Sequence, residues 1–340
     1  MDVRALWDPE AGYLNTANYG LPPRPAFDAM QAALGDWRTG RSGWEPWDES
    51  VGRSREIFAR LVGVDQRDVT VGATVSQLLG QVATALPAGA RIVCPEEEFT
   101  SNLFPWFAGR DAEVQTLPAA RLAEAVDART TLVAFSLVQS ATGEIAPYDE
   151  IIAAANHHGV LVTVDATQSC GWLPFDARRV DAYAAHAYKW LMSPRGSAFL
   201  ATSPRLRSRM RPFSAGWYAG EDVHASYYGP PPRLADDARR FDISPAWFSW
   251  VGTAPALETV ERLGIKAIHD HDVGLANRLR KGLGLDQGDS AIVSVEVPDA
   301  MGRLRRAGVT AAVRAGYARM SCHVYTTEHD VDMAIDALSG

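Results

Sequence analysis

The sequence predicts an α/β protein whose mostly parallel sheet is covered by helices on both faces. Two observations predict this fold. Short apolar runs alternate with amphipathic helical stretches through the centre of the 340-residue chain, which is the order that crossover helices produce between parallel strands. The runs are continuously apolar, as is typical of strands buried on both faces. We expect this large domain to span residues 21–255.

Six apolar runs between residues 90 and 203 are the expected strands. In chain order they read ARIVCPEEE, AEVQTLP, TTLVAFSLV, GVLVTVDAT, VDAYAAHAY and GSAFLATS. Helical periodicity marks WDESVGRSREIFARLVG ahead of them and YDEIIAAANHH between the third and the fourth. Gly159 directly follows the second of these helices, and we expect it to end the helix because glycine readily adopts the left-handed conformation.

A smaller α+β domain is expected to follow, over residues 256–340. The stretch VGTAPALETVERLG predicts a long helix that leads into this domain. SAIVSVEV is one of its expected strands, and EHDVDMAIDALSG is its closing helix.

The composition argues against several classes of protein. The net charge of -8 opposes nucleic-acid binding, which requires a basic face. No run of 18 apolar residues occurs, so neither membrane insertion nor secretion is expected. Cys94, Cys170 and Cys322 show no CxxC spacing, which disfavours a disulfide framework or a zinc site and indicates the reducing cytoplasm. In IHDHDV, His269 and His271 do not share a helix face, so we expect an exposed helix surface and assign no metal.

Polar residues fall where the expected strands end. Asp165 closes GVLVTVDAT, and Lys189 directly follows VDAYAAHAY. Ligands of open α/β sheets bind beyond the carboxyl ends of the strands. Thr74 stands at the start of an expected helix, where free backbone N–H groups can hold a phosphate. An amine, a carboxylate and a phosphate cradle are the groups that pyridoxal 5′-phosphate (PLP) requires, so the sequence indicates this cofactor.

Seven stretches carry a resemblance to a known family. They are YLNTANYG, VGATVSQ, EEFTSNLFPW, SLVQSATGEIAP, VDATQSCGWLPFD, HAYKWLMSPRGSAFL and ARMSCHVYTTEHDVDMAIDAL. In this order they resemble the class V aminotransferase family of fold type I PLP-dependent enzymes, over nearly the whole chain. The resemblance implies a seven-stranded sheet and a homodimer with shared active sites. It also implies an N-terminal segment, residues 1–20, that packs on the active site and on the small domain.

The resemblance assigns roles around the cofactor ring. Lys189 matches the Schiff-base lysine, and Asp165 matches the acid that keeps the pyridine nitrogen protonated. Gln168 matches the residue that hydrogen-bonds the phenolic oxygen of the cofactor, with Ser140 as a second neighbour. Phe99 occupies the position that stacks on the ring.

Further matches concern the cofactor phosphate and the substrate. Ala73 and Thr74 occupy the phosphate turn, and His186 matches a phosphate ligand. Ser244 is the candidate for a hydroxyl that serves the phosphate site of the neighbouring subunit. The partner is expected to be a small-molecule amino acid substrate. Arg319 matches the arginine that binds its α-carboxylate, for which the planar guanidinium is suited, and Asn18 and Tyr19 are expected to approach it.

Two departures from the family pattern bear on the reaction. Phe99 stands where desulfurases carry histidine, and phenylalanine cannot transfer protons, so acid–base work falls to Lys189. Desulfurases also place a nucleophilic cysteine ahead of the position of Arg319, and none occurs here. We therefore favour transamination, with a β-eliminating C–S lyase as the alternative, and disfavour an epimerase or a desulfurase. Because Lys189, Asp165 and Arg319 are all in place, a non-catalytic scaffold is disfavoured too.

Overall fold

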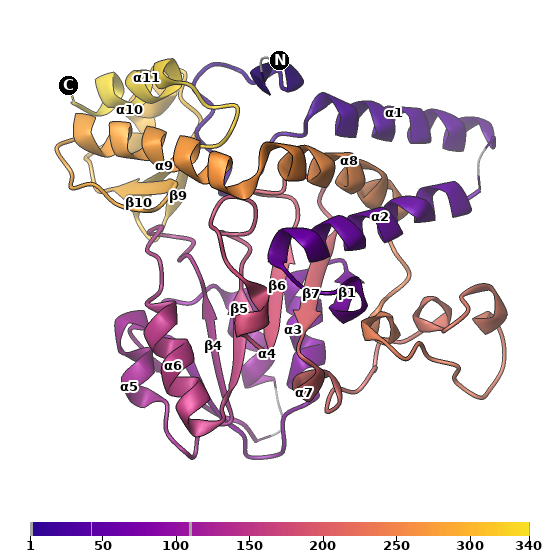
Figure 1. Ribbon diagram of the computed structural model, residues 1–340. Helices are drawn as coiled ribbons and strands as arrows, with labels where there is room; N and C mark the ends of the chain where they lie inside the picture. The colour runs from indigo at the N-terminus through magenta and orange to yellow at the C-terminus, as the bar shows by residue number, and fades with distance from the viewer. Residues whose placement is uncertain (1–2, 42, 109–110, 340) are drawn as a thin grey trace.

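The computed structural model describes residues 3–41, 43–108 and 111–339, and it contains two sheets (Figure 1). The strands of the larger sheet are β1 (Val69–Gly72), β2 (Arg91–Pro95), β3 (Glu113–Leu117), β4 (Leu132–Ser136), β5 (Leu161–Asp165), β6 (Ala182–His186) and β7 (Ala198–Thr202). The helices in this part of the chain are α1 (Arg24–Thr39), α2 (Glu45–Val62), α3 (Val75–Ala83), α4 (Phe104–Phe107), α5 (Leu122–Ala125), α6 (Tyr148–His158), α7 (Pro204–Arg207) and α8 (Trp247–Leu263).

The larger sheet has the order β1-β7-β6-β5-β4-β2-β3. Strands β2 to β6 run parallel to their neighbours among themselves, whereas β7 is antiparallel to both β6 and β1. This confirms the mostly parallel, seven-stranded sheet. The register pairs Ser136 with Asp165, and Asp165 with Ala184. The carboxyl ends of β4, β5 and β6 are therefore level, and the polar residues that follow them meet at one edge.

Local signals in the sequence set the ends of the helices that matter for the site. The Thr74 hydroxyl caps α3 by accepting a hydrogen bond from the backbone N–H of Gln77 at 3.2 Å. This bond satisfies one of the free N–H groups of the first turn. Gly159 ends α6 with a φ of 68°, as predicted.

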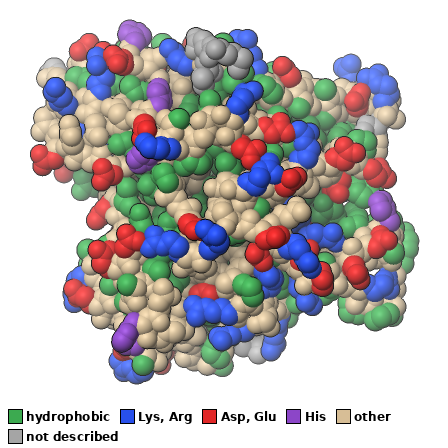
Figure 2. Space-filling view, viewed as in Figure 1, with side chains coloured by type: hydrophobic (Ala, Val, Ile, Leu, Met, Phe, Trp, Pro, Cys, Tyr) green, Lys and Arg blue, Asp and Glu red, His purple; other side chains and the backbone are tan. Residues whose placement is uncertain are grey.

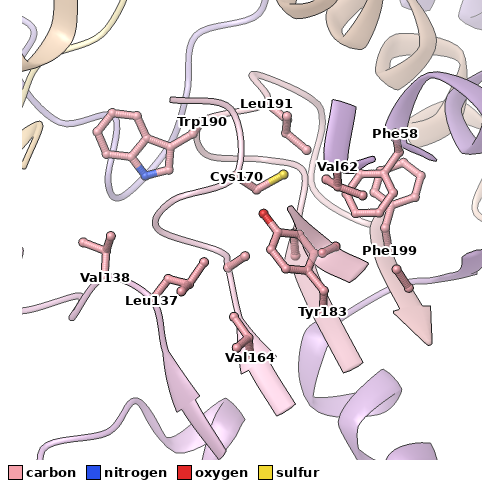
Figure 3. Close-up of a cluster of buried hydrophobic side chains, with 14 of the residues drawn as sticks. Phe58, Val62, Leu137, Val138, Val164, Cys170, Tyr183, Trp190, Leu191 and Phe199 are labelled. Carbon is pink, nitrogen blue, oxygen red and sulfur yellow. The ribbon is translucent and has the colours of Figure 1, made fainter. Parts of the chain in front are cut away.

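The core fills both faces of the larger sheet. In β6, Tyr183 and Ala185 belong to one apolar cluster, and Ala182 and Ala184 belong to a second one. Successive side chains of a strand point to opposite faces, so both faces of β6 are covered. Figure 3 shows part of the first cluster, in which the ring of Phe58 stacks on that of Phe199 with centroids 4.3 Å apart. Burial on both faces is the reason that the strand runs read as continuously apolar.

The smaller sheet has the order β8-β10-β9, with β8 (Ile292–Val295), β9 (Ala312–Arg314) and β10 (Tyr317–Ser321) antiparallel. It lies beside α9 (Ile265–Gly282), α10 (Ala300–Arg306) and α11 (Glu328–Ser339) (Figure 1). The N-terminal segment joins it through bridges between Tyr13 and Thr310 and between Asn15 and Ser321. We propose the division at residues 255 and 256 as the domain boundary; this point falls within α8, which packs on α1 and α2.

Charges of both signs mix on the surface. Figure 2 shows acidic and basic side chains interspersed over the visible face. Exposed ion pairs join Arg60 to Glu261 at 2.6 Å and Arg278 to Asp332 at 2.8 Å. Within the described part of the chain, no helix combines the length and the apolar character needed to cross a membrane.

Candidate active site

A cavity of about 290 Å³ opens beyond the carboxyl ends of β4, β5 and β6. The N-terminal segment and the β9–β10 hairpin supply its other walls. Its lining residues are Ala17, Asn18, Phe99, Ser101, Ser136, Ser140, Asp165, Thr167, Gln168, His186, Tyr188, Lys189, Arg195, Arg314 and Arg319. A second hollow, of about 520 Å³, is larger. Its arginines are already engaged in ion pairs, namely Arg60–Glu261, Arg178–Asp176 and Arg179–Asp149. The 290 Å³ cavity is the candidate site because eight of the predicted residues line it, among them Asp165, Lys189 and Arg319.

Lys189 reaches this cavity from the turn that follows β6. Its side-chain amine lies 5.8 Å from the ring centre of Phe99 and 5.7 Å from that of Tyr188. Burial lowers the pKa of Lys189 to about 7, an effect that the charge of Asp165 partly opposes. An amine with this pKa is substantially neutral at physiological pH and can act as a nucleophile or a base.

Asp165 ends β5 and is buried. Its Oδ1 atom accepts a hydrogen bond from the backbone N–H of Thr167 at 2.8 Å. Burial raises the pKa of Asp165, while the Thr167 contacts and the charge of Lys189 lower it. A cationic partner inside the cavity would stabilise the ionised form of this buried carboxylate.

Gln168 and His186 are held in place by neighbouring backbone and side-chain groups. The Gln168 amide donates to the Ala17 carbonyl at 2.9 Å and accepts from the Trp190 indole at 2.9 Å, so one of its two amide hydrogens is left over. His186 Nε2 accepts from the Val75 N–H at 3.2 Å, at the start of α3. Burial lowers the pKa of His186 to about 3. The ring is thus neutral, and Nδ1 carries its proton with no partner in the described chain.

Arg319 comes from β10 and is almost fully buried, at 2% exposure. Its Nη1 atom donates to the backbone carbonyl of Ser140. Its Nε and Nη2 atoms are buried and find no partner among the described residues. Burial, followed by the charge of Arg314, lowers the pKa of Arg319 to about 10. Two unsatisfied, adjacent donors of a guanidinium match the two oxygens of a carboxylate.

The predicted site residues divide into two groups. Asn18, Phe99, Ser140, Asp165, Gln168, His186, Lys189 and Arg319 line the cavity together. Ala73, Thr74, Tyr19 and Ser244 do not line it. Thr74 precedes Val75, whose N–H contacts His186, and the hydroxyl of Tyr19 accepts from the Arg195 N–H at 3.2 Å. Ser244 is exposed and lies outside the cavity of its own chain.

The sequence reasoning missed several lining residues, of which Arg195 and Arg314 carry charge. The Arg195 guanidinium lies 4.9 Å from the ring centre of Tyr188. A signal for Arg314 existed in the sequence VRAGYAR: a two-residue turn at Ala-Gly would pair two short strands and place Arg314 and Arg319 on one face.

None of the three cysteines lines the cavity. Cys170 lies in the core, where Figure 3 shows its sulfur beside the hydroxyl of Tyr183, and burial raises the pKa of its thiol to about 12. Cys322 directly follows β10 and is fully buried, and burial raises the pKa of its thiol as well. Buried thiols of raised pKa are poor nucleophiles.

The expectation of an exposed helix surface at IHDHDV was wrong: Asp270 is exposed, but His269 and His271 are half-buried and Ile268 and Asp272 are buried. Asp272 is fully buried, and its Oδ2 atom lies 2.7 Å from Nδ1 of His323. The Nε2 atom of His323 donates to the Trp190 carbonyl at 3.1 Å, next to Lys189. A partner 51 residues away offsets the cost of burying this carboxylate. Across the described ranges, no group of three or more His, Cys, Asp or Glu could hold a metal ion.

A family model described as "Aminotransferase class-V" matches residues 48–300 of the chain. Isopenicillin N epimerase of Streptomyces clavuligerus is 28% identical, over 99% of this chain and 97% of its own. The uncharacterized aminotransferase YcbU of Bacillus subtilis is 27% identical, over 86% and 85%. A probable cysteine desulfurase of Methanothermobacter thermautotrophicus is 26% identical, over 78% and 71%.

Solved structures share the fold. The cystine C–S lyase C-DES, in complex with cysteine persulfide, has a TM-score of 0.86 at 23% identity over 97% of both chains. A mutant of C-DES with glycine covalently linked to its PLP cofactor has a TM-score of 0.87 at 22% identity, over 99% of this chain and 98% of that one. These matches confirm the fold type I architecture.

Proposed function

The chain belongs to the class V aminotransferase family, and from this premise we propose that it is a lyase that removes the Cα proton of an α-amino acid and eliminates a sulfur substituent from its β-carbon. One observation carries the proposal: the cavity combines an amine of lowered pKa and an unsatisfied arginine but contains no thiol. Sulfur would then leave with its own substituent instead of passing to the protein.

PLP is the cofactor of this enzyme, and the lining residues fit it. When bound, PLP supplies an electron sink for the negative charge that develops at Cα. The fit rests on groups that lack partners in the described chain. His186 Nδ1 is buried and unsatisfied, as are two donors of Arg319, and groups of this kind call for a ligand.

Each cavity residue then has a proposed place around the cofactor. Lys189 forms the covalent link, and Asp165 pairs with the pyridine nitrogen. The leftover amide hydrogen of Gln168 donates to the phenolic oxygen, with Ser140 nearby. Phe99, which faces Lys189 across the cavity, stacks on the ring.

We place the phosphate group of the cofactor at the start of α3. The Thr74 N–H and the Nδ1 hydrogen of His186 are the donors proposed there, the Ala73 N–H donates to Gln77 Oε1 at 3.3 Å in the structure and would have to exchange this partner, and the first turn of a helix favours an anion. Arg195 adds a positive charge near His186, whose pKa is lowered by burial first and by the charges of Lys189 and Arg195 after it.

Lys189 and Arg319 divide the work on the substrate. Arg319 binds the α-carboxylate with its two free donors, assisted by Asn18, whereas Tyr19 lies outside the lining of the cavity. Lys189 takes the proton from Cα at its Nζ atom, as the sole amine among the described lining residues. The Cα–H electron pair forms the new double bond, the Cβ–S bond breaks, and the sulfur group leaves with that bond's electrons. Water converts the released product to pyruvate and ammonia.

Relatives whose names refer to sulfur chemistry support the elimination of a sulfur group over epimerisation at Cα. A probable cysteine desulfurase aligns with 78% of the chain, yet no cysteine here reaches the cavity. An epimerase needs a proton donor on the face opposite its base, and in this proposal that face is covered by Phe99, which has no proton to donate and whose ring centre lies 5.8 Å from the Lys189 amine.

Transamination is the second candidate. The relative described as an aminotransferase favours it, and Phe99 offers no acid to help a poor leaving group depart. In that reaction Lys189 would deliver the proton to C4′ of the cofactor.

A single-turnover experiment separates the two reactions. The holoenzyme is mixed with S-substituted cysteines or with alanine, without any α-keto acid. Elimination predicts pyruvate and ammonia from the cysteine derivatives, with the cofactor spectrum restored after each turnover. Accumulation of pyridoxamine phosphate without pyruvate from the cysteine derivatives would overturn the proposal in favour of transamination.

We also propose a homodimer in the cytoplasm. Ser244 lies outside the cavity of its own chain, as a residue that serves the partner's phosphate site would. All three cysteines are free and buried, which suits a reducing compartment. Light scattering of the purified protein should give twice the chain mass, and a monomeric mass at full activity would contradict the shared site.

A further inference from the structure

We infer that Arg314 forms a second anion site in the active-site cavity, and that the substrate is an amino acid with an additional acidic group beyond its β-carbon. The inference rests on the proposed function in one respect, that Arg319 binds the α-carboxylate. S-linked cysteine derivatives with a distal carboxylate are the substrate class that this geometry fits.

The β9–β10 hairpin fixes the position of Arg314. In the register, Arg314 pairs with Tyr317, and Ala312 pairs with Arg319. Paired residues lie on the same face, and so do residues two apart along a strand. Arg314 and Arg319 therefore project from one face of the small sheet, and both line the cavity.

The turn between the two strands holds this arrangement. Ala315 and Gly316 have φ values of 48° and 88°, and two successive left-handed residues are typical of the tight hairpin turn that matches the twist of its strands. Alanine rarely adopts this conformation, because its Cβ atom approaches the following carbonyl oxygen. The two-residue loop leaves no slack by which Arg314 could shift register.

Arg314 lacks an acidic partner within the described chain. Its guanidinium donates to the Asn18 side-chain carbonyl at 2.8 Å and to its neighbour's backbone carbonyl, Val313 O, at 2.7 Å. Both acceptors are neutral. Two other arginines of the small domain are paired with carboxylates, in the Arg278–Asp332 and Arg306–Asp299 bridges, whereas Arg280 and Arg303 donate to backbone carbonyls away from the cavity.

The arginines of the cavity come from two elements. Arg195 follows the turn that carries Lys189, and its guanidinium lies 4.9 Å from the ring centre of Tyr188, whereas Arg314 and Arg319 project from one face of the small sheet. Burial is the main cause of the lowered pKa values of His186 and Arg319; the charges of Lys189 and Arg195 add to it at His186, and the charge of Arg314 adds to it at Arg319. Arg195 and the start of α3 can thus balance the phosphate, whereas Arg314 and Arg319 together face a single α-carboxylate. The guanidinium of Arg314 therefore binds a second anionic group of the substrate. This group relieves the electrostatic repulsion between Arg314 and Arg319.

Arg314 and its Asn18 acceptor form the outer part of this end of the cavity. Arg314 is partly exposed, whereas Arg319 is buried. The α-carboxylate therefore belongs at Arg319, close to Lys189, and the distal acid belongs at Arg314, farther from the reacting carbon. An exposed ion pair contributes less free energy of binding than a buried one. Arg314 therefore contributes more to the choice between substrates than to the overall affinity.

The test compares two substrates that differ only in the distal acid. Holoenzymes of the wild type, Arg314→Gln and Arg314→Lys are assayed with S-(2-carboxyethyl)cysteine and with S-propylcysteine. Arg305→Gln is the matched control, because Arg305 is exposed on α10 and does not line the cavity.

We expect Arg314→Gln to lower kcat/KM for the acidic substrate by about tenfold and to leave the neutral substrate within about twofold. Arg314→Lys should recover part of the loss, and the control should match the wild type. Equal losses for both substrates would overturn the inference, since Arg314 would then serve the α-carboxylate or the fold.

A binding measurement gives a readout that needs no turnover. Calorimetric titration of the wild-type holoenzyme should show tighter binding of glutarate than of butyrate, and Arg314→Gln should remove this difference. If this difference is present but no sulfur compound is eliminated, the proposed reaction fails and the second anion site stands. If elimination occurs but wild type binds both acids equally, the anion site is wrong and the proposed reaction stands.

Discussion

Lys189 combines burial with a nearby carboxylate, and its titration is the first property to test. Burial lowers the pKa of its amine from 10.5 to about 7. The neutral amine is the form that reacts with an aldehyde, and a lowered pKa makes this form predominant above about pH 7. We expect the rate at which the apoenzyme captures added PLP to rise with pH, with a midpoint near 7. Stopped-flow absorbance measures this rate, and a midpoint above 9 would contradict the burial of the amine. Lys189→Ala should abolish the covalent link.

Arg319 is the second test at the scale of single residues. Arg319→Ala removes two donors that the structure leaves free for a carboxylate. We expect KM for amino-acid substrates to rise by about 30- to 1,000-fold, corresponding to the loss of about 2–4 kcal/mol of buried charge pairing. Steady-state kinetics with the isosteric amine of the same substrate is the control, because that amine has no carboxylate to lose. An unchanged KM for the amino acid would show that Arg319 does not bind it.

At the scale of elements, the N-terminal segment packs directly on the turn that carries Lys189. The Gly20 N–H donates to the Tyr188 carbonyl at 2.9 Å. A Cβ atom at Gly20 would lie 1.9 Å from the Lys189 carbonyl oxygen, which backbone atoms cannot accommodate without moving. Gly20→Ala should therefore displace the segment or the lysine turn. We expect activity to fall by at least about tenfold, since displacements near 1 Å have large effects on positioned groups.

Gly35 provides the matched control for that change. It lies inside α1, and a Cβ atom there meets nothing within 4 Å. Gly35→Ala should leave activity unchanged and raise the free energy of unfolding by about 0.5–1 kcal/mol, because alanine favours the helix. Urea denaturation and kinetics of both variants check the pair. Full activity in Gly20→Ala would mean that the contact does not position Lys189.

At the scale of the whole molecule, the buried Asp272–His323 pair links the small domain to the active site. Asp272 belongs to α9, and His323 reaches from the end of β10 to the carbonyl of Trp190. Asp272→Ala would leave the imidazole with one unsatisfied nitrogen in the core. We expect a loss of about 1–3 kcal/mol in the free energy of unfolding. Asp272→Asn, which can still accept a hydrogen bond, should lose less, and equal losses in denaturant titrations would argue against this bond.

The sequence by itself determined six of the seven strands of the larger sheet and the polar residues at its carboxyl edge, whereas β1 (Val69–Gly72) was not among the predicted runs. Alternating apolar runs fix which segments become strands, and parallel strands place the residues after them, Asp165 and Lys189, at one edge for geometric reasons. Both signals are local, so they can be read along the chain. The strand order and the antiparallel direction of β7 depend on how the strands assemble, and a single sequence read locally does not contain them.

The tertiary structure alone decided the surroundings of the site residues. Arg319 meets the carbonyl of Ser140, 179 residues away in the chain, and this contact leaves its other donors free for a ligand. Asp272 is buried because a partner 51 residues away accompanies it, although its own helix suggested an exposed face. The hairpin that carries Arg314 could be read from its own sequence, but only the tertiary structure brings Arg314 into one cavity with Asp165 and Lys189. Burial and charge pairing arise between segments distant in sequence, and they determine which polar side chains carry chemistry and which support the fold.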